Sequence, residues 1–400
     1  SDPDQRALLR LLTEAFGPAF LVDARLGSVV TLKHVLLSLK YGHSELSAFG
    51  YASYGYILAG PLGRPFDAQR FGHLALQLIE RFPSAEVVSR VHYMVGFYLG
   101  LTQPLRSTIT HYTMALQLGL EAGELVFSSQ GAVFIPMTHL RLGDDLGLVR
   151  ESIARAEAVL QRTQDVLSTA MLMPLQQIVE GLRHRAWWGG PLEEDTQEER
   201  AWLAGIDASG MVVVRILHHI SKLIVLTFFA EYERARDVIA AVEPILFNAV
   251  AAPYTTDFPY YAALTLAALY PSLPEAQREA GLADIRRHRD AVAALAANCP
   301  ENEQHRLLLV DAELARVTGQ ALAAMDGYER AIDSAHRGTF YHHEALANEL
   351  CARFHLAGGR TRVAHVYLNQ ARFLYDRWGA VAKVVDVEAR VSEVGEQHIA

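Results

Sequence analysis

The tetrapeptide Ala-Leu-Gln-Leu at residues 75–78 returns at residues 115–118, and each copy lies inside a stretch with the apolar periodicity of a helix. Counted from Ala75 to Ala115, the two copies are 40 residues apart. A looser third copy centres on Ala156, one residue late. A fixed period of this length predicts a series of similar helical units that stack on one another.

The same offset returns near the C-terminus. A set of small, bulky and small side chains occurs twice, 40 residues apart: Ala324, Tyr328 and Ala331, then Ala364, Leu368 and Ala371. Residues at this spacing share one face of a helix. Small side chains let the second helix of a hairpin approach the first closely, and the bulky one fills the gap between units. Gly319 and Gly359, five residues before each set, can adopt the left-handed turn between helices.

These patterns predict an all-α fold, a tetratricopeptide-like array of helical hairpins (an α-solenoid) with a period of about 40 residues. The tetratricopeptide unit has about 34 residues, so the helices should be longer, and a HEAT-like geometry also fits the spacing. The stretch Trp187-Trp188-Gly189-Gly190-Pro191 and the acidic run after it interrupt the period. We therefore expect two helical-repeat arrays, residues 1–190 and residues 191–400.

The composition narrows the functional classes. Apolar residues make up 51% of the chain, and the net charge of −9 comes without a basic run, so a nucleic-acid partner is not expected. Two cysteines, Cys299 and Cys351, are too few for a disulfide framework and indicate a reducing, cytoplasmic location. The most apolar window, residues 211–230, contains Lys222 and Arg215, which favours a buried helix over a membrane span. The abrupt N-terminus suggests a fragment of a longer protein.

Four stretches resemble the helical-repeat region of very large bacterial and fungal hybrid kinases: Ser47–Gly55, Asn298–Asn302, His343–Leu350 and Tyr367–Ala380. In that family a serine/threonine-kinase-like domain, a P-loop ATPase, the repeats, a GAF domain and a histidine kinase share one polypeptide. The resemblance covers most of the chain. It implies a regulatory segment of a two-component signalling protein, flanked by ATPase and kinase modules.

No catalytic, cofactor or metal site is expected in the chain itself. The nearest string to a phosphate-binding loop, Phe354–Thr361, has Phe in place of the first Gly and Arg in place of Lys. The pairs His218-His219 and His342-His343 cannot chelate alone, because neighbours on a helix point about 100° apart. We expect them to form hydrogen bonds at the surface or between repeats, and the carboxylates of residues 193–195 to be solvated.

Aromatic side chains at helical spacing are the candidate ligand contacts of a groove or of the junction between the two halves: Tyr51, Tyr54, Tyr93, Phe97, Trp187, Trp188, Tyr254 and Tyr260. Tyrosine offers apolar area and a hydroxyl to a peptide or a small ligand. Packing between repeats is the alternative role for the same residues.

Two functions follow as hypotheses. The first is a non-catalytic regulatory or scaffolding module that binds a protein or peptide and couples flanking ATPase and kinase modules, with no nucleic-acid or membrane partner. The second is a sensor that encloses a small-molecule effector in the groove or near Trp187 and Trp188.

Overall fold

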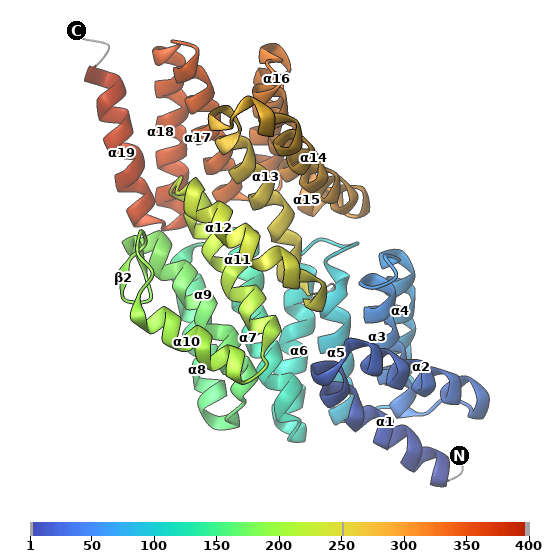
Figure 1. Cartoon of the computed structure of the whole chain (residues 1–400). Coiled ribbons are helices and arrows are strands. Elements are labelled where there is room, and N and C mark those ends of the chain that lie inside the picture. The colour runs from blue at the N-terminus through green and yellow to red at the C-terminus, as the bar shows by residue number, and fades with distance from the viewer. Residues whose placement is uncertain (1–2, 250–251, 397–400) are drawn as a thin grey trace. The chain divides into compact units, whose positions relative to one another are not determined.

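The computed structural model describes residues 3–249 and 252–396, which are almost entirely helical (Figure 1). The first nine helices are α1 Pro3–Val22, α2 Ala24–Tyr41, α3 Glu45–Ala59, α4 Pro65–Arg81, α5 Ala85–Leu99, α6 Ser107–Ala122, α7 Leu125–Leu142, α8 Leu146–Thr163 and α9 Val166–His184. The only strands among the described residues, β1 Ala186–Trp187 and β2 Gly190–Pro191, form a short antiparallel hairpin.

Ten further α-helices and three 3-10 helices follow: α10 Gln197–Ala208, α11 Val212–Phe228, α12 Tyr232–Val242, η1 Glu243–Ala249, η2 Pro253–Thr256, α13 Asp257–Leu269, η3 Tyr270–Ser272, α14 Glu275–Asn298, α15 Pro300–Val317, α16 Ala321–Arg337, α17 Tyr341–Ala357, α18 Thr361–Trp378 and α19 Val381–Glu396.

The chain divides into two compact units that interleave in sequence. Unit 1 comprises Ser1–Thr138, Arg155–Ala170 and Phe247–Pro253, and unit 2 comprises His139–Ala154, Met171–Leu246 and Tyr254–Ala400. Helices α7, α8 and α9 therefore contribute residues to both units. The boundary near residue 190 that we expect between two arrays stays a prediction.

Unit 1 is built from helical hairpins in which α1 packs on α2, α3 on α4, and α5 on α6. The first helices of neighbouring hairpins also pack together, as α3 does with α5. A Cβ atom added to Gly131 of α7 would lie 2.9 Å from the carbonyl oxygen of Tyr112 and 3.4 Å from the Cβ of Ala115. The backbones of α6 and α7 thus meet where one side is glycine and the other alanine.

Unit 2 repeats the plan with the pairs α11 and α12, α13 and α14, α15 and α16, and α17 and α18, and α19 packs on α18. A Cβ atom on Gly327 would lie 2.9 Å from the Cβ of Ala312, so α15 and α16 also approach closely. Gly319 and Gly359 precede α16 and α18 with φ of 76° and 70°, which confirms the left-handed turns predicted from their positions.

The structure confirms the predicted all-α fold of helical-hairpin repeats. Helix α16 begins at Ala321 and α18 at Thr361, the interval of 40 residues seen in the sequence. All nine residues assigned to repeat packing are at most 2% exposed: Ala75, Ala115, Ala156, Ala324, Tyr328, Ala331, Ala364, Leu368 and Ala371. Small and bulky residues at these positions are thus part of the core within each unit.

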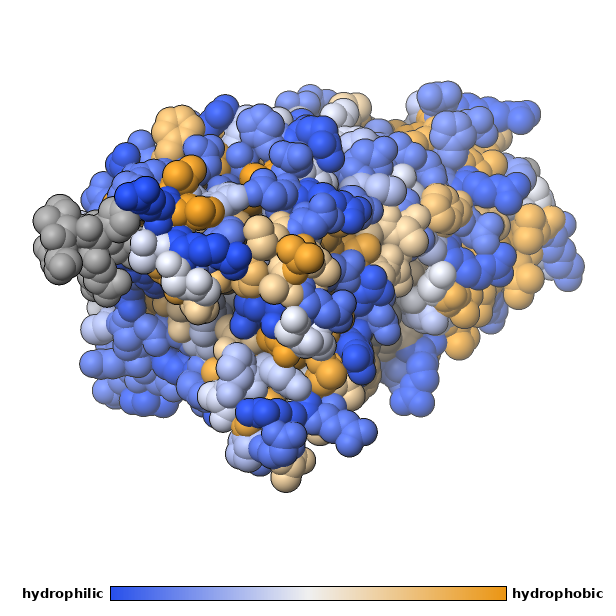
Figure 2. Space-filling model, turned by 90° about the horizontal axis from the view of Figure 1, so that it is seen from above, coloured by the Kyte–Doolittle hydropathy of each residue, from blue (hydrophilic) through white to orange (hydrophobic). Residues whose placement is uncertain are grey.

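The surface is mixed in polarity. On the face that Figure 2 shows, hydrophilic residues predominate and hydrophobic residues are interspersed among them. Across residues 3–249 and 252–396, no helix is both long enough and apolar enough to cross a membrane. The apolar window at residues 211–230 forms α11, whose side chains are mostly buried.

We predict that Ala331→Arg lowers the free energy of unfolding by several kcal/mol, because it forces a charge into a packed helix face where Ala331 is 1% exposed. Urea unfolding measures the loss. The control is Ala323→Arg, at an exposed position of the same helix, which should change stability by less than about 0.5 kcal/mol. Equal stability of wild type and Ala331→Arg would contradict the packing register described here.

Candidate functional site

Four of the predicted contact residues lie in the aromatic interior of unit 1. Tyr51 is 1% exposed, and its hydroxyl lies 2.9 Å from Nε2 of His43. Tyr54 is partly exposed and makes an edge contact with Phe71 at a centroid distance of 4.8 Å. Each of these side chains packs against other aromatic residues of the same unit.

Tyr93 and Phe97 belong to a second cluster in unit 1. Their rings lie 5.6 Å and 5.4 Å, respectively, from the ring of Phe134 on α7. Tyr93 is buried and Phe97 is partly exposed. Two further candidates, Tyr254 and Tyr260, are buried in unit 2 at 3% and 0% exposure. These six aromatic residues thus lie in or at the edge of packed interiors.

The last two candidates, Trp187 and Trp188, lie in the β-hairpin of unit 2. The two residues at its turn, Trp188 and Gly189, have positive φ of 49° and 74°. This turn buries Trp187 completely, and its indole Nε1 donates a hydrogen bond of 3.0 Å to Glu199. Trp188 is half-buried, and its ring lies 4.9 Å from that of Trp202 on α10. Trp187, one of the residues predicted to lie at the junction between the two halves, is therefore hydrogen-bonded to the ionised side chain of Glu199.

Glu199 forms one wall of a pocket of about 240 Å³ inside unit 2, between α10, α11 and α12. The lining residues follow one face of each helix: Glu199, Arg200 and Leu203 of α10, then His219, Lys222 and Leu226 of α11, then Arg234, Asp237, Val238 and Ala241 of α12, with Asp195 from the loop before α10. The pocket thus combines ionised groups with four apolar side chains.

Glu199 is a buried carboxylate whose oxygens are fully engaged. It accepts hydrogen bonds from Lys222 at 2.8 Å and 2.9 Å, and its Oε1 also lies 2.9 Å from Nε2 of His218. Burial alone would raise the pKa of Glu199, but the hydrogen bonds from His218, Lys222 and Trp187 and the charge of Lys222 lower it to about 2. Burial lowers the pKa of His218, so its neutral ring donates to the carboxylate through Nε2.

Asp195 lies between two of the three cations that line the pocket, Lys222 and Arg234. Its Oδ1 accepts hydrogen bonds from Nζ of Lys222 at 2.8 Å and from the guanidinium of Arg234 at 2.6 Å. The hydrogen bond from Lys222 keeps the pKa of Asp195 below its ordinary value. The side chain of Asp195 is 60% exposed, whereas that of Lys222 is 8% exposed. A solvent-accessible carboxylate thus neutralises a cation that is almost buried.

The three cations of the lining, Arg200, Lys222 and Arg234, are balanced by three carboxylates, so an anion would bind here in place of Asp195. Lys222 and Arg234 are fixed donors, and Leu203, Leu226, Val238 and Ala241 supply an apolar surface beside them. Nδ1 of His219, another lining residue, has no hydrogen-bond partner among the described residues. The pocket therefore offers charged and neutral polar groups to a ligand that carries a carboxylate on an apolar stem.

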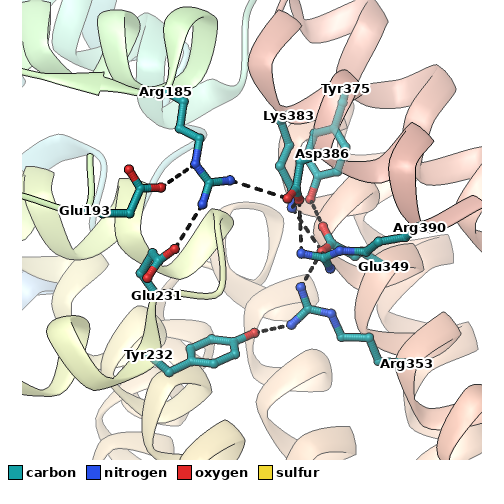
Figure 3. A network of polar contacts seen from close by, with 10 residues as sticks. All are labelled: Arg185, Glu193, Glu231, Tyr232, Glu349, Arg353, Tyr375, Lys383, Asp386 and Arg390. Carbon is teal, nitrogen blue, oxygen red and sulfur yellow. Dashed lines mark hydrogen bonds and ion pairs between the residues drawn. The ribbon is translucent and has the colours of Figure 1, made fainter. Parts of the chain in front are cut away.

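A second polar cluster in unit 2 is closed by its own contacts (Figure 3). Glu349 of α17 is fully buried and accepts hydrogen bonds from Lys383 at 3.0 Å, from Arg390 at 2.7 Å and from Tyr375 at 2.8 Å. Charges of Lys383, Arg353 and Arg390 hold the pKa of Glu349 low against the effect of burial. Since each carboxylate oxygen is already bonded, we assign this cluster to packing of α17, α18 and α19 on one another and, through Arg353 with Tyr232 and Asp386 with Arg185, on α12 and the start of the β-hairpin (Figure 3).

Histidines form a third cluster, in the core of unit 2. The rings of His342 and His343 stack at a centroid distance of 3.7 Å, and Nδ1 of His343 lies 2.7 Å from Nε2 of His305. Burial lowers the pKa of all three histidines well below the usual value, so they are neutral. Over the described ranges, no group of three or more His, Cys, Asp or Glu side chains is arranged to hold a metal ion.

Sequence reasoning missed the pairing of Lys222 with Glu199 and the role of Asp195. Residues 193–195 are exposed, as we expected, but Asp195 is also ion-paired with Lys222 and Arg234, and Glu193 with Arg185. Lys222 among the apolar residues of α11 was the available signal, since a buried cation needs a partner. The spacing of 23 residues between Lys222 and Glu199 gave no means of finding that partner.

Solved structures of helical proteins resemble the chain at low sequence identity. No protein-family model and no curated protein matches the chain. A solved structure of a Rap protein in complex with competence and sporulation factor matches 88% of this chain and 98% of its own, at 11% identity and a TM-score of 0.44. A circular tandem repeat protein matches 99% of this chain and 97% of its own, at 13% identity and a TM-score of 0.23. Neither likeness is close enough to assign a fold or a function.

Replacing Lys222 should destabilise the protein, because the buried carboxylate of Glu199 is then left without its cation. We predict that Lys222→Met lowers the free energy of unfolding by about 3–5 kcal/mol, because Glu199, with its side chain 3% exposed, loses its cation. The double variant Glu199→Gln/Lys222→Met should recover most of this loss. Urea unfolding compares them with Arg236→Met, an exposed residue of α12 that should change stability by at most about 1 kcal/mol. A Lys222→Met protein as stable as the control would refute the assignment.

The neutral histidines predict acid sensitivity. Their folded-state pKa values are depressed, so below about pH 6.5 the unfolded chain binds more protons and stability falls as the pH decreases. Urea unfolding at pH 7.5 and 5.5 should show a loss of roughly 1 kcal/mol per buried histidine at the lower pH. His343→Gln should reduce this pH dependence. Equal stability at both pH values would rule out a neutral histidine core.

Proposed function

We propose that this chain is a non-catalytic helical-repeat interaction module that binds an acidic residue of a protein or peptide partner in the pocket between α10, α11 and α12. One observation carries the proposal: the carboxylate of Asp195 bridges Lys222 and Arg234 from an exposed loop. A carboxylate of a partner can take the same two hydrogen bonds.

Exchange of one carboxylate for another keeps the pocket electrically balanced. Lys222 would be left without its exposed partner if Asp195 moved away alone, although Glu199 would still accept its hydrogen bonds. An incoming carboxylate removes the free-energy cost of leaving Lys222 without that partner, because the buried cation is again paired with two anions. The net gain in binding then comes from the apolar stem of the partner residue against Leu226 and Val238.

A small-molecule effector is the second candidate for the same pocket. The volume of about 240 Å³ lies just below the range of 300–1,000 Å³ usual for small-molecule sites. A pocket of this size would accommodate a small molecule with a short carboxylate. The hairpin of Trp187 and Trp188, where the sequence predicts an effector site, lies next to Glu199.

The partner's place in a larger protein follows from the resemblance to hybrid kinases. We propose that the acidic segment belongs to a flanking ATPase or kinase module of a cytoplasmic signalling protein, and that its binding couples these modules. The buried, unpaired Cys299 and Cys351 are in keeping with a reducing compartment. The proposed division into residues 1–190 and 191–400 falls in the β-hairpin next to the pocket.

Fluorescence anisotropy tests the proposal with a labelled heptapeptide library that has Glu fixed at the centre, and with a matched library that has Gln there. We predict that the Glu library binds and the Gln library does not. Arg234→Gln should weaken binding about tenfold or more, because a charge-assisted hydrogen bond is lost. Asp195→Ala should strengthen it, because the internal competitor is removed.

The control variant is Arg236→Gln, which removes a cation from the same helix but lies outside the pocket. Glutarate serves as the small-molecule probe. If glutarate binds in an Arg234-dependent way and the Glu library does not, the effector function replaces the peptide function. Equal binding of the Glu and Gln libraries, or wild-type binding by Arg234→Gln, would overturn the carboxylate site.

A further inference from the structure

Helix α2 of unit 1, whose place in the fold Figure 1 shows, reverses the usual distribution of side chains between the core and the solvent. Small and polar residues form its buried face: Gly27, Thr31, His34, Val35 and Ser38. Large apolar residues form its outer face: Leu26, Val29, Leu32, Leu36 and Leu39, each between 42% and 64% exposed. An amphipathic surface helix normally turns its apolar face toward the core and its polar face toward the solvent.

The inner face of α2 is fixed in place. His34 is 2% exposed, and its Nε2 lies 3.2 Å from the hydroxyl of Thr13 on α1. A Cβ atom on Gly27 would clash with the ring of Phe20 at 2.3 Å, and one on Gly50 of α3 would clash with His34 at 2.0 Å. The helix therefore cannot rotate to bury its leucines in the core of unit 1.

Other second helices of unit 1 do not share this property. On α4 the exposed positions are mostly polar, with Arg70, His73, Gln77 and Glu80 among them, and Phe66 is the exposed large apolar residue. The apolar face of α2 is thus a feature of this helix and not of the repeat.

The spacing on α2 is that of a coiled-coil seam. Val29, Leu32, Leu36 and Leu39 follow one another at intervals of 3, 4 and 3 residues, which matches positions a and d of two heptads. Lys33 and Lys40 then occupy both e positions, and both are exposed. Side chains at e and g form the ion pairs that select the partner of a coiled coil. The sequence of α2, residues 24–41, contains no Asp or Glu.

This charge pattern argues against a second copy of the chain as the partner. In an antiparallel pair of α2 helices, the e positions face each other, so Lys33 of one copy would oppose Lys40 of the other. In a parallel pair, the lysines would meet the g positions, Ser28 and Val35, but neither carries a charge and Val35 is buried within unit 1. Self-association leaves every lysine without a counter-charge, whereas an acidic helix pairs with both.

We propose that the outer face of α2 docks an amphipathic helix of another protein segment, with Leu or Val along its seam and Asp or Glu beside it. The leucines of α2 bury their exposed area against that seam, and Lys33 and Lys40 pair with the flanking carboxylates. The surface is independent of the carboxylate pocket, because none of its residues lines that pocket.

Isothermal titration tests this with two synthetic three-heptad peptides that carry Leu at a and d, one with Glu and one with Lys at the flanking e and g positions. The acidic peptide should bind at least tenfold more tightly than the basic one. Leu32→Gln/Leu36→Gln should weaken its binding at least tenfold, and Lys33→Glu/Lys40→Glu should reverse the preference between the peptides. Phe66→Gln, an equally exposed apolar residue on α4, should have no effect.

Three results would overturn the proposal. Equal affinity for the two peptides, or binding of neither, would exclude an acidic helix as the partner. A dimer of the free protein that dissociates in Leu32→Gln/Leu36→Gln would identify a second copy as the occupant. Sedimentation with phosphatidylserine vesicles without peptide binding would identify α2 as a lipid-binding helix.

Discussion

Close approach between helices at alanine and glycine is the constraint on which both units depend. Gly131 against Ala115 in unit 1, and Gly327 against Ala312 in unit 2, allow two backbones to meet with no side chain between them. Bulky residues such as Tyr328 then fill the space that the next hairpin leaves. Because contacts of this kind occur in both units, local pairs of helices can build an extended core without long-range strand pairing.

Closely packed helices exclude water from the core, so the charged side chains buried inside unit 2 are paired with side chains of opposite charge. Both carboxylate oxygens of Glu349 already accept hydrogen bonds from Tyr375, Lys383 and Arg390. The pair of Lys222 and Glu199 differs, because its third member, Asp195, comes from an exposed loop. A buried cation that is neutralised from the solvent side is the chemical basis for a binding site that exchanges carboxylates.

The sequence predicted the fold because the signals for it are local: apolar periodicity, alanine at a fixed offset, and glycine at the turns. It did not predict the pocket, because Lys222 and Glu199 meet through tertiary packing of α10 on α11 and no spacing rule relates them. The candidate aromatics show the same limit, since Tyr51 and Tyr260 have a helical period whether they line a groove or fill a core, and only the packing shows that they are buried. On α2 the heptad spacing of apolar residues is visible in the sequence, but the sequence does not show which face of the helix is buried.

A crystal structure of the Asp195→Ala protein with a bound Glu-centred peptide would show whether a partner's carboxylate can take the place of Asp195. We expect the glutamate carboxylate to lie within hydrogen-bond distance of Nζ of Lys222 and of the guanidinium of Arg234, the two groups that Asp195 now bridges. Its methylene stem should contact Leu226 and Val238. A peptide bound elsewhere on the chain, with solvent between Lys222 and Arg234, would contradict the account.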